Sequence, residues 1–261
     1  MAEAMAAGLL KQSIFRPEQI TASHPREERR NELSQRYGIT TTGSNREIAA
    51  GLPASGIVVL AVKPQRLTDV LDDIGDMIGP EMLVISIVAG ARIGTIAEAL
   101  GTDRVIRAMP NTPAQIGAGM TAWTCFENVG DGDRLDVETI LGALGSVLYV
   151  ETENMIDMAT SLSATGPTYV FMVMEALTDA GVHLGFSREV SKELVQQTIL
   201  GSVRFAMESH KHPAELRNMV TSPGGTSAEA IYQMEKGGLR TVLSKAVFSA
   251  YRRAVELGKP K

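Results

Sequence analysis

A glycine turn followed by hydroxyl residues offers the strongest chemistry in the sequence. The run Ser-Pro-Gly-Gly-Thr-Ser occupies residues 222–227. Pro223 fixes one backbone dihedral, and Gly224 and Gly225 adopt positive φ values without a steric penalty. Thr226 and Glu229 have the spacing of a capping box, which predicts that a helix begins here. Unpaired amides at a helix N-terminus attract a carboxylate or a phosphate, although an ordinary loop with a cap would also explain the pattern.

Two further polar segments follow stretches with the pattern of strands. Residues 61–64, Ala-Val-Lys-Pro, place Lys63 where it could face a phosphate or a ribose, but an exposed lysine before a helix-starting proline is also common. Farther along, Pro110 and Pro113 bracket Asn111 and Thr112. Ligands of open α/β sheets bind beyond the carboxyl ends of strands, so both segments are candidates for ligand contacts. A merely stiff turn is the alternative for the second segment.

The first predicted strand ends at Ser-His-Pro-Arg, residues 23–26. In dinucleotide folds an acidic residue at this place binds the ribose 2′-hydroxyl, whereas a nearby arginine accommodates a 2′-phosphate. Neither Ser23 nor His24 is acidic and Arg26 is close, which favours NADP(H) over NAD(H), with NAD(H) as the other candidate. The histidines have no cysteine or carboxylate cluster at ligand spacing, so no metal site is predicted.

These segments need a sheet to position them, and the first half of the chain has the pattern of one. Continuous apolar runs at residues 57–62, 83–88 and 105–109 are typical of parallel strands buried on both faces. Helical spacing at 65–78 and 93–100 separates them, and a strand pair near 120–126 and 147–151 would complete the sheet edge. We therefore expect a Rossmann-like parallel α/β domain at residues 1–152.

The second half, residues 153–261, is predicted to be an all-α domain. Residues 169–177 are apolar on nearly every face apart from Glu175. A helix of that kind must be buried, and a small helical domain rarely has enough core to bury it, so we expect a second subunit to cover it. The predicted helices occupy residues 155–163, 169–184, 190–209, 213–220, 227–236 and 239–257.

The chain begins with a helical pattern at residues 1–11, followed by a strand at 19–23. A Rossmann sheet normally opens with a central strand and a glycine-rich turn that holds the cofactor pyrophosphate. No such strand precedes the first helix, and its loss would leave neighbouring backbone groups unpaired, at about 1–3 kcal/mol for each buried group. We therefore expect roughly ten residues upstream of Met1 to supply it, with Met1 as an internal methionine.

Composition narrows the class of protein. A net charge of −5 and a pI near 5.5 argue against a general nucleic-acid surface, because such a surface needs clustered lysine and arginine. No apolar run reaches the roughly 18 residues of a membrane span. The single cysteine, Cys125, fits a reducing compartment. We expect a cytoplasmic protein of the soluble α/β class.

Taken together, the chain resembles the pyrroline-5-carboxylate reductase family over essentially its whole length. The stretch at 220–229 carries the resemblance most specifically, and the runs at 162–169 (Leu-Ser-Ala-Thr-Gly-Pro-Thr-Tyr) and 107–114 (Arg-Ala-Met-Pro-Asn-Thr-Pro-Ala) support it independently. The resemblance implies an N-terminal Rossmann domain, and a helical domain that interleaves with a partner subunit in a homodimer able to assemble further. It assigns cofactor contacts to Ser23, Pro25, Asn45, Ala61, Val62, Lys63, Pro64, Ile87, Val88 and Ala89, beside the Arg26 argued above, and substrate or product contacts to Glu153, Thr226 and Ser227.

The implied reaction is hydride transfer from C4 of a dihydronicotinamide to C5 of the cyclic imine 1-pyrroline-5-carboxylate, which gives L-proline with the ring nitrogen protonated; the imine can take that proton from solvent before it binds. The substrate carboxylate would lie on the amides of Gly224, Gly225 and Thr226, and the hydroxyl of Ser227, the predicted catalytic residue, would bind the ring nitrogen. Where the family commonly has a second threonine, this chain has Ser227, which keeps the hydroxyl. No compelling general acid is evident. Two alternatives stay open: another imine or β-hydroxyacid-type reductase, and a non-catalytic oligomeric binding protein that has lost its cofactor grip.

Overall fold

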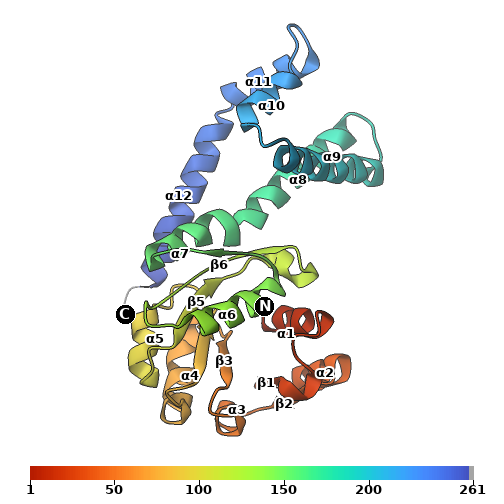
Figure 1. Ribbon diagram of the computed structural model, residues 1–261. Helices are drawn as coiled ribbons and strands as arrows, with labels where there is room; N and C mark the ends of the chain where they lie inside the picture. Colours follow the sequence, from red (N-terminus) through yellow and green to blue (C-terminus); the bar gives the residue numbers. More distant parts are fainter. Residues whose placement is uncertain (259–261) are drawn as a thin grey trace. The chain divides into compact units, whose positions relative to one another are not determined.

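The strands of the chain form two separate sheets in this computed structural model, which describes residues 1–258. The larger sheet has the order β3-β4-β5-β6-β7 (Figure 1). Strands β3, β4 and β5 are mutually parallel, β6 runs antiparallel to β5, and β7 runs parallel to β6. The bounds are Ile57–Leu60 for β3, Leu83–Ser86 for β4, Val105–Met109 for β5, Gly119–Cys125 for β6 and Gly145–Tyr149 for β7.

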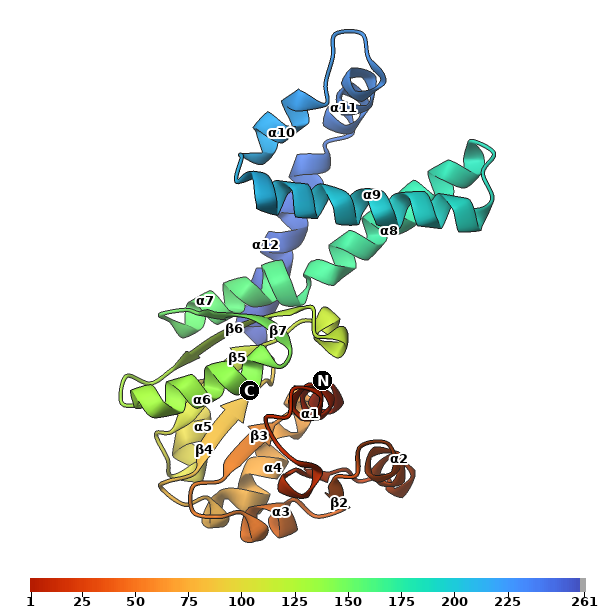
Figure 2. The same ribbon diagram turned by 45° about the vertical axis from the view of Figure 1, so that its right-hand side comes forward.

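Both faces of the larger sheet are covered, as the continuous apolar runs predicted. Every residue of β4 and β5 is buried. One face packs against α4 (Leu67–Ile74) and α5 (Ile93–Leu100), and the other packs against α1 (Ala2–Lys11) and α6 (Asp131–Gly142) (Figure 2). The predicted strands at 57–62 and 83–88 are shorter than expected, and the helix expected at 65–78 consists of α4 between the short 3₁₀ turns η2 (Pro64–Arg66) and η3 (Gly75–Met77).

The smaller sheet pairs β1 (Thr21–Ser23) with β2 (Thr40–Thr42) in parallel, and α2 (Glu27–Tyr37) connects them. Helix α3 (Asn45–Gly51) follows β2. The strand expected at 19–23 starts later, because Pro17 opens a 3₁₀ turn, η1 (Pro17–Gln19). Among the described residues, no strand pairs with both β1 and β3, so the smaller and the larger sheet are not hydrogen-bonded to each other.

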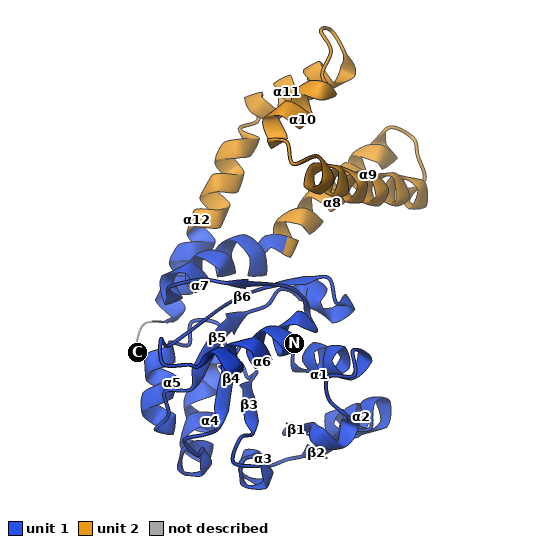
Figure 3. Ribbon diagram, in the orientation of Figure 1, with its two compact units in different colours: residues 1–166, 249–261 blue, residues 167–248 orange. Residues whose placement is uncertain are grey.

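The chain separates into two compact units, residues 1–166 with 249–261 and residues 167–248 (Figure 3). The first unit contains both sheets, α7 (Glu153–Ala159) and the π-helical turn η5 (Thr160–Ala164). The domain boundary expected at 152/153 stays a prediction, since this division by compactness falls after Gly166 and returns the end of the chain to the first unit. None of the helices in residues 1–258 is long and apolar enough to span a membrane.

The second unit is helical, as predicted. Helix α8 (Gly166–His183) leaves many large apolar side chains exposed within the single chain, among them Phe171 at 57% and Met172 at 65%. Helices α9, α11 and α12 do the same, so these faces have too little core of their own. The helices are α8 (Gly166–His183), α9 (Arg188–Ser209), α10 (Pro213–Met219), α11 (Thr226–Lys236) and α12 (Leu239–Leu257), whose last residues belong to the first unit.

Candidate functional site

The carboxyl edge of β3 and β4 brings together two of the predicted cofactor segments. The amide of Ile87 donates to the carbonyl of Leu60 at 3.0 Å, so residues 61–64 and 87–89 leave the sheet as neighbours. Lys63 is exposed, and Pro64 begins η2 directly after it. The edge therefore combines a small apolar turn with one exposed cation, which suits the nucleoside end of a dinucleotide.

The turn after β4, residues 87–92, is held closely on several sides. The amide of Val88 donates to Ser86 Oγ at 3.3 Å, and the side chain of Val88 is buried. Gly90 has a φ of +77°, and a Cβ there would lie only 2.7 Å from the carbonyl carbon of Leu257 at the end of α12. The turn therefore requires glycine at this position both for its backbone conformation and for the approach of α12.

A second group of predicted cofactor residues lies on the smaller sheet. Ser23 Oγ donates to Asn45 Oδ1 at 2.7 Å, and Asn45 Nδ2 donates to Asp73 Oδ2 at 3.2 Å. Arg26 is exposed at the N-terminus of α2. Sequence reasoning missed Arg30, whose Nη1 donates to the carbonyls of His24 and Pro25 and so fixes the turn that carries Arg26. Its spacing of four residues from Arg26 on one helix was the available signal.

The proline-bracketed segment after β5 has a structural explanation. The amide of Met120 donates to Asn111 Oδ1 at 2.9 Å, and Asn111 Nδ2 donates to the carbonyl of Ser163 at 3.3 Å. Both ends of the Asn111 side chain thus connect β6 and η5 to this turn. The stiff-turn alternative accounts for Asn111 without a ligand.

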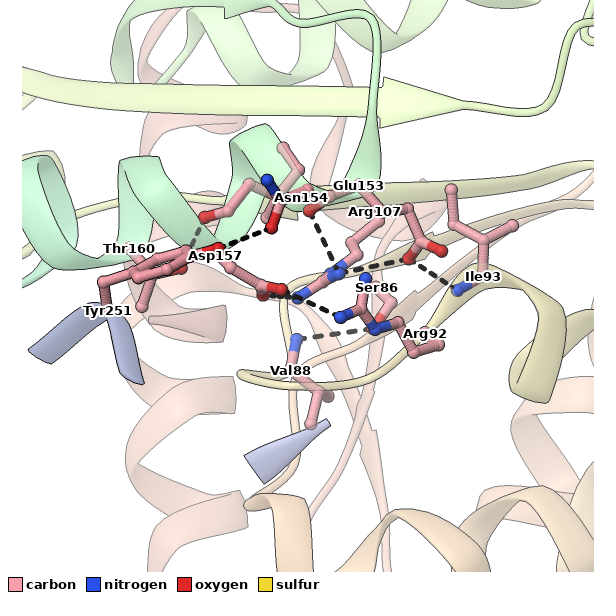
Figure 4. Close-up of polar contacts among 11 residues, drawn as sticks. Ser86, Val88, Arg92, Ile93, Arg107, Glu153, Asn154, Asp157, Thr160 and Tyr251 are labelled. Carbon is pink, nitrogen blue, oxygen red and sulfur yellow. Dashed lines mark hydrogen bonds and ion pairs between the residues drawn. The ribbon is translucent and has the colours of Figure 1, made fainter. Parts of the chain in front are cut away.

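A buried ion cluster at α7 was not foreseen from the sequence (Figure 4). Arg107 of β5 is fully buried, and its Nη2 lies 2.6 Å from Asp157 Oδ1 while its Nη1 lies 3.1 Å from Glu153 Oε1. Asp157 Oδ2 also pairs with Arg92 Nη2 at 3.0 Å, and the amide of Ile93 donates to Glu153 Oε1 at 2.9 Å. Glu153, which was predicted to contact substrate, therefore has one carboxylate oxygen already engaged with the fold.

In the helical unit, the loop before α11 forms the expected glycine turn, but not the expected cap. Gly224 has a φ of +69°, and a Cβ at Gly225 would lie 2.5 Å from Ser222 Oγ. The predicted capping box is wrong: Gly225 is the N-cap residue without a side-chain bond, and the helix already starts at Thr226. Glu229 instead accepts a hydrogen bond from Gln233 one turn later, because both side chains lie on the exposed helix face.

The amides of this loop divide into two sets. The amide of Gly225 donates to the carbonyl of Ser222 at 3.0 Å, which closes the turn. The first backbone bonds of the helix come from Ala228 and Glu229, both to the carbonyl of Gly225. The amides of Thr226 and Ser227 precede these bonds at the positive end of the helix, where an anion is stabilised.

Other reactive groups fit structural roles. Within residues 1–258, no group of three or more His, Cys, Asp or Glu side chains could hold a metal ion. His212 caps α10, with its Nδ1 accepting from the amide of Ala214 at 3.2 Å. Burial raises the pKa of the Cys125 thiol, so Cys125 is not an activated nucleophile.

Comparison with known proteins assigns both halves of the chain. The model of the pyrroline-5-carboxylate reductase dimerisation family matches residues 153–257, and that of the coenzyme F420-dependent NADP oxidoreductase family matches residues 1–90. A pyrroline-5-carboxylate reductase from Synechocystis is 40% identical over 260 residues, covering 99% of this chain and 95% of that protein. The chain belongs to the pyrroline-5-carboxylate reductase family.

Solved structures agree with this assignment. A family member from Coxiella burnetii is 36% identical, with a TM-score of 0.88 over 99% of this chain and 95% of the other. The Plasmodium falciparum pyrroline carboxylate reductase, solved with NADP bound, is 33% identical, with a TM-score of 0.89 over 98% and 94%. The Rossmann-like fold followed by a helical dimerisation domain is thus confirmed for this member of the family. The family uses a nicotinamide cofactor and a small-molecule substrate, and its helical half is a dimerisation domain.

Proposed function

We infer that this chain reduces 1-pyrroline-5-carboxylate to L-proline with NAD(P)H, the last step of proline biosynthesis. The observation that carries the inference is similarity to reductases of this name over 99% of the chain, through the sheet domain and the helical domain alike. A non-catalytic binding protein would not need both the polar carboxyl edge of the sheet and the anion-binding turn before α11. The alternative of a β-hydroxyacid-type reductase is disfavoured, because the 40% identity is to a pyrroline-5-carboxylate reductase.

The residues after β1, β3 and β4 are those that would hold the nicotinamide cofactor. Their chemistry fits it: a small apolar turn at Ile87, Val88 and Ala89, the segment 61–64, and the hydrogen-bonded pair Ser23 and Asn45. When bound, the dihydronicotinamide supplies the hydride that reduces the imine carbon. NADP(H) is the preferred form, because β1 ends without a carboxylate and Arg26 stands exposed beside Pro25.

The turn before α11 would bind the substrate carboxylate. The amides of Thr226 and Ser227 suit it best, and Gly224 gives the backbone its αL conformation. Gly225 acts through the turn that it closes rather than through a free amide. The Ser227 hydroxyl hydrogen-bonds the ring nitrogen and orients the imine face. Glu153 is the other residue that the family resemblance assigns to substrate or product. The protein thus contributes chiefly positioning.

The exposed apolar faces of the helical unit support an interleaved homodimer that assembles further. Phe171 and Met172 on α8 would be covered by the partner's helices, because many large apolar side chains gathered on the same helices are rarely left in water. We also propose a cytoplasmic location, supported by the single cysteine of the sequence.

Oxidation of NADPH on addition of pyrroline-5-carboxylate tests the function. Ser227→Ala should cut turnover by at least tenfold while NADPH binding stays unchanged, and Ser202→Ala, an exposed helix serine bonded to the carbonyl of Thr198, serves as the matched control. Unchanged turnover in Ser227→Ala would remove that residue from the mechanism. No turnover by this chain would favour the binding-protein alternative.

A further inference from the structure

The buried ion cluster fastens α7 to two elements of the sheet domain at once. Asp157 offers one carboxylate oxygen to Arg107 on β5 and the other to Arg92 at the start of α5. Glu153, one turn earlier on α7, accepts from Arg107 and from the amide of Ile93, the first residue of α5. Figure 4 shows the four charged side chains converging from these three elements. Two cations thus balance two anions, and the central pair of Arg107 and Asp157 is excluded from water, while Arg92 and Glu153 are partly exposed.

The same cluster lies at both ends of the predicted cofactor turn. At one end, Ser86 pairs in register with Arg107 across β4 and β5, and its hydroxyl holds the amide of Val88. At the other end, Arg92 and Ile93 bond to Asp157 and Glu153 on α7. Between these ends, Ala89 packs against the buried cluster that contains Ile156 of α7. The conformation of residues 87–92 therefore depends on where α7 sits.

A purely stabilising role explains this arrangement poorly. Well-packed apolar residues often replace a buried ion pair without loss of stability, so charge in this place indicates a requirement for orientation. A guanidinium fork bonded to two carboxylates fixes direction and distance, which apolar packing does not.

We propose that Arg107 and Asp157 are positioning residues that hold the cofactor turn through α7, and that Glu153 belongs to this device rather than to the substrate site. The proposal rests on the proposed function for the identity of the cofactor. Neither residue needs to touch a ligand, because each acts through residues 86–93. The nearest bonded route from Asp157 to the turn runs through Arg92.

Two variants test the proposal, and NADPH fluorescence titration reads binding without turnover. Arg107→Lys keeps the charge but lacks the fork, and Asp157→Asn keeps the shape of the side chain. We expect both to raise the Kd and KM for NADPH by about tenfold to a hundredfold, with the KM for pyrroline-5-carboxylate within about twofold of wild type. Arg104→Lys is the control, since Arg104 also pairs with two carboxylates, Glu81 and Asp133, but away from the turn.

Glu153→Gln separates the two roles of that residue and should fold, since the side chain is partly exposed. The expected result is a higher Kd for NADPH with an unchanged KM for pyrroline-5-carboxylate. A rise confined to the KM for pyrroline-5-carboxylate would return Glu153 to the substrate site and overturn the proposal. Wild-type Kd values for NADPH in folded Arg107→Lys and Asp157→Asn would overturn it as well. Wild-type protein that binds NADPH without reducing pyrroline-5-carboxylate would refute the proposed function alone.

Discussion

Gly90→Ala should destabilise the sheet domain far more than an ordinary glycine substitution. An alanine with a φ near +77° carries a strain of about 1–2 kcal/mol. In addition, its Cβ would meet backbone atoms of Leu257 and Gly258 at 2.7–2.9 Å, and relieving such overpacking costs about 1–3 kcal/mol. The expected loss is therefore about 2–5 kcal/mol, a large share of the roughly 5–15 kcal/mol that stabilises a domain.

Gly101→Ala is the matched control for this experiment. Gly101 ends α5 with a φ of +64°, and a Cβ there would have no neighbour within 4 Å, so only the strain of about 1–2 kcal/mol applies. Urea unfolding is followed by the fluorescence of Trp123, the only tryptophan, which is buried in the same unit. Equal protein concentrations are needed, because self-association contributes to stability. Equal losses in the two variants would refute the close packing of α12 against the cofactor turn.

Three further predictions address assembly, pH and cofactor choice. Phe171→Asp on α8 should lower the mass measured by light scattering towards that of a monomer. Leu135→Asp, at a position on α6 of the sheet unit that is at least as exposed, should not; unchanged mass in Phe171→Asp would exclude this face of α8 from the interface. Burial raises the pKa of Glu3, but hydrogen bonds from Tyr37 and an arginine outweigh it, so the net pKa is lowered. The contribution of Glu3 to stability is present above its unfolded pKa of about 4.3 and is lost as the pH falls through the lower folded pKa. Glu3→Gln should therefore lower the free energy of unfolding more at pH 6 than at pH 3, and a loss that does not depend on pH would contradict this. Arg26→Gln should raise the Kd for NADPH about tenfold and leave that for NADH unchanged, whereas equal losses for both would show that Arg26 does not bind the 2′-phosphate.

The elements that could be predicted from the sequence are strands that are completely buried and helices whose apolar residues recur at helical spacing. Strand β5 and helices α5 and α12 have the predicted bounds. Every residue of β5 is buried, and the apolar positions of the two helices recur at helical spacing. Helix α2 carries a single buried residue, Leu33, and β2 consists of three threonines. Neither has an apolar pattern that would predict it. Their structure depends on packing against neighbours that the local sequence does not reveal.

The candidate site divides in the same way. A glycine turn before a helix is a local feature, so the loop at 222–227 could be predicted. The cap could not, because the helix starts one residue earlier than the capping box required: its N-cap residue is Gly225 and not Thr226. The pairs Arg107–Asp157 and Arg92–Asp157 join residues 50 and 65 positions apart. Nothing in the period or composition of either segment connects them, because a charged residue inside a buried strand has the same local context whether or not it has a partner.

That distant pairing also fixes the position of α7 along its axis. Its apolar face packs through Ile156 into a small cluster with Met109, Ala122 and Val150, and such packing tolerates a shift of the helix along its axis. A shift by one residue would carry Asp157 away from the guanidinium fork and leave Arg107 buried without its counter-ion, which is far more costly than a change in apolar contacts. The ion cluster therefore determines the register of α7, and through Arg92 and Ile93 the same register is imposed on the turn that follows β4.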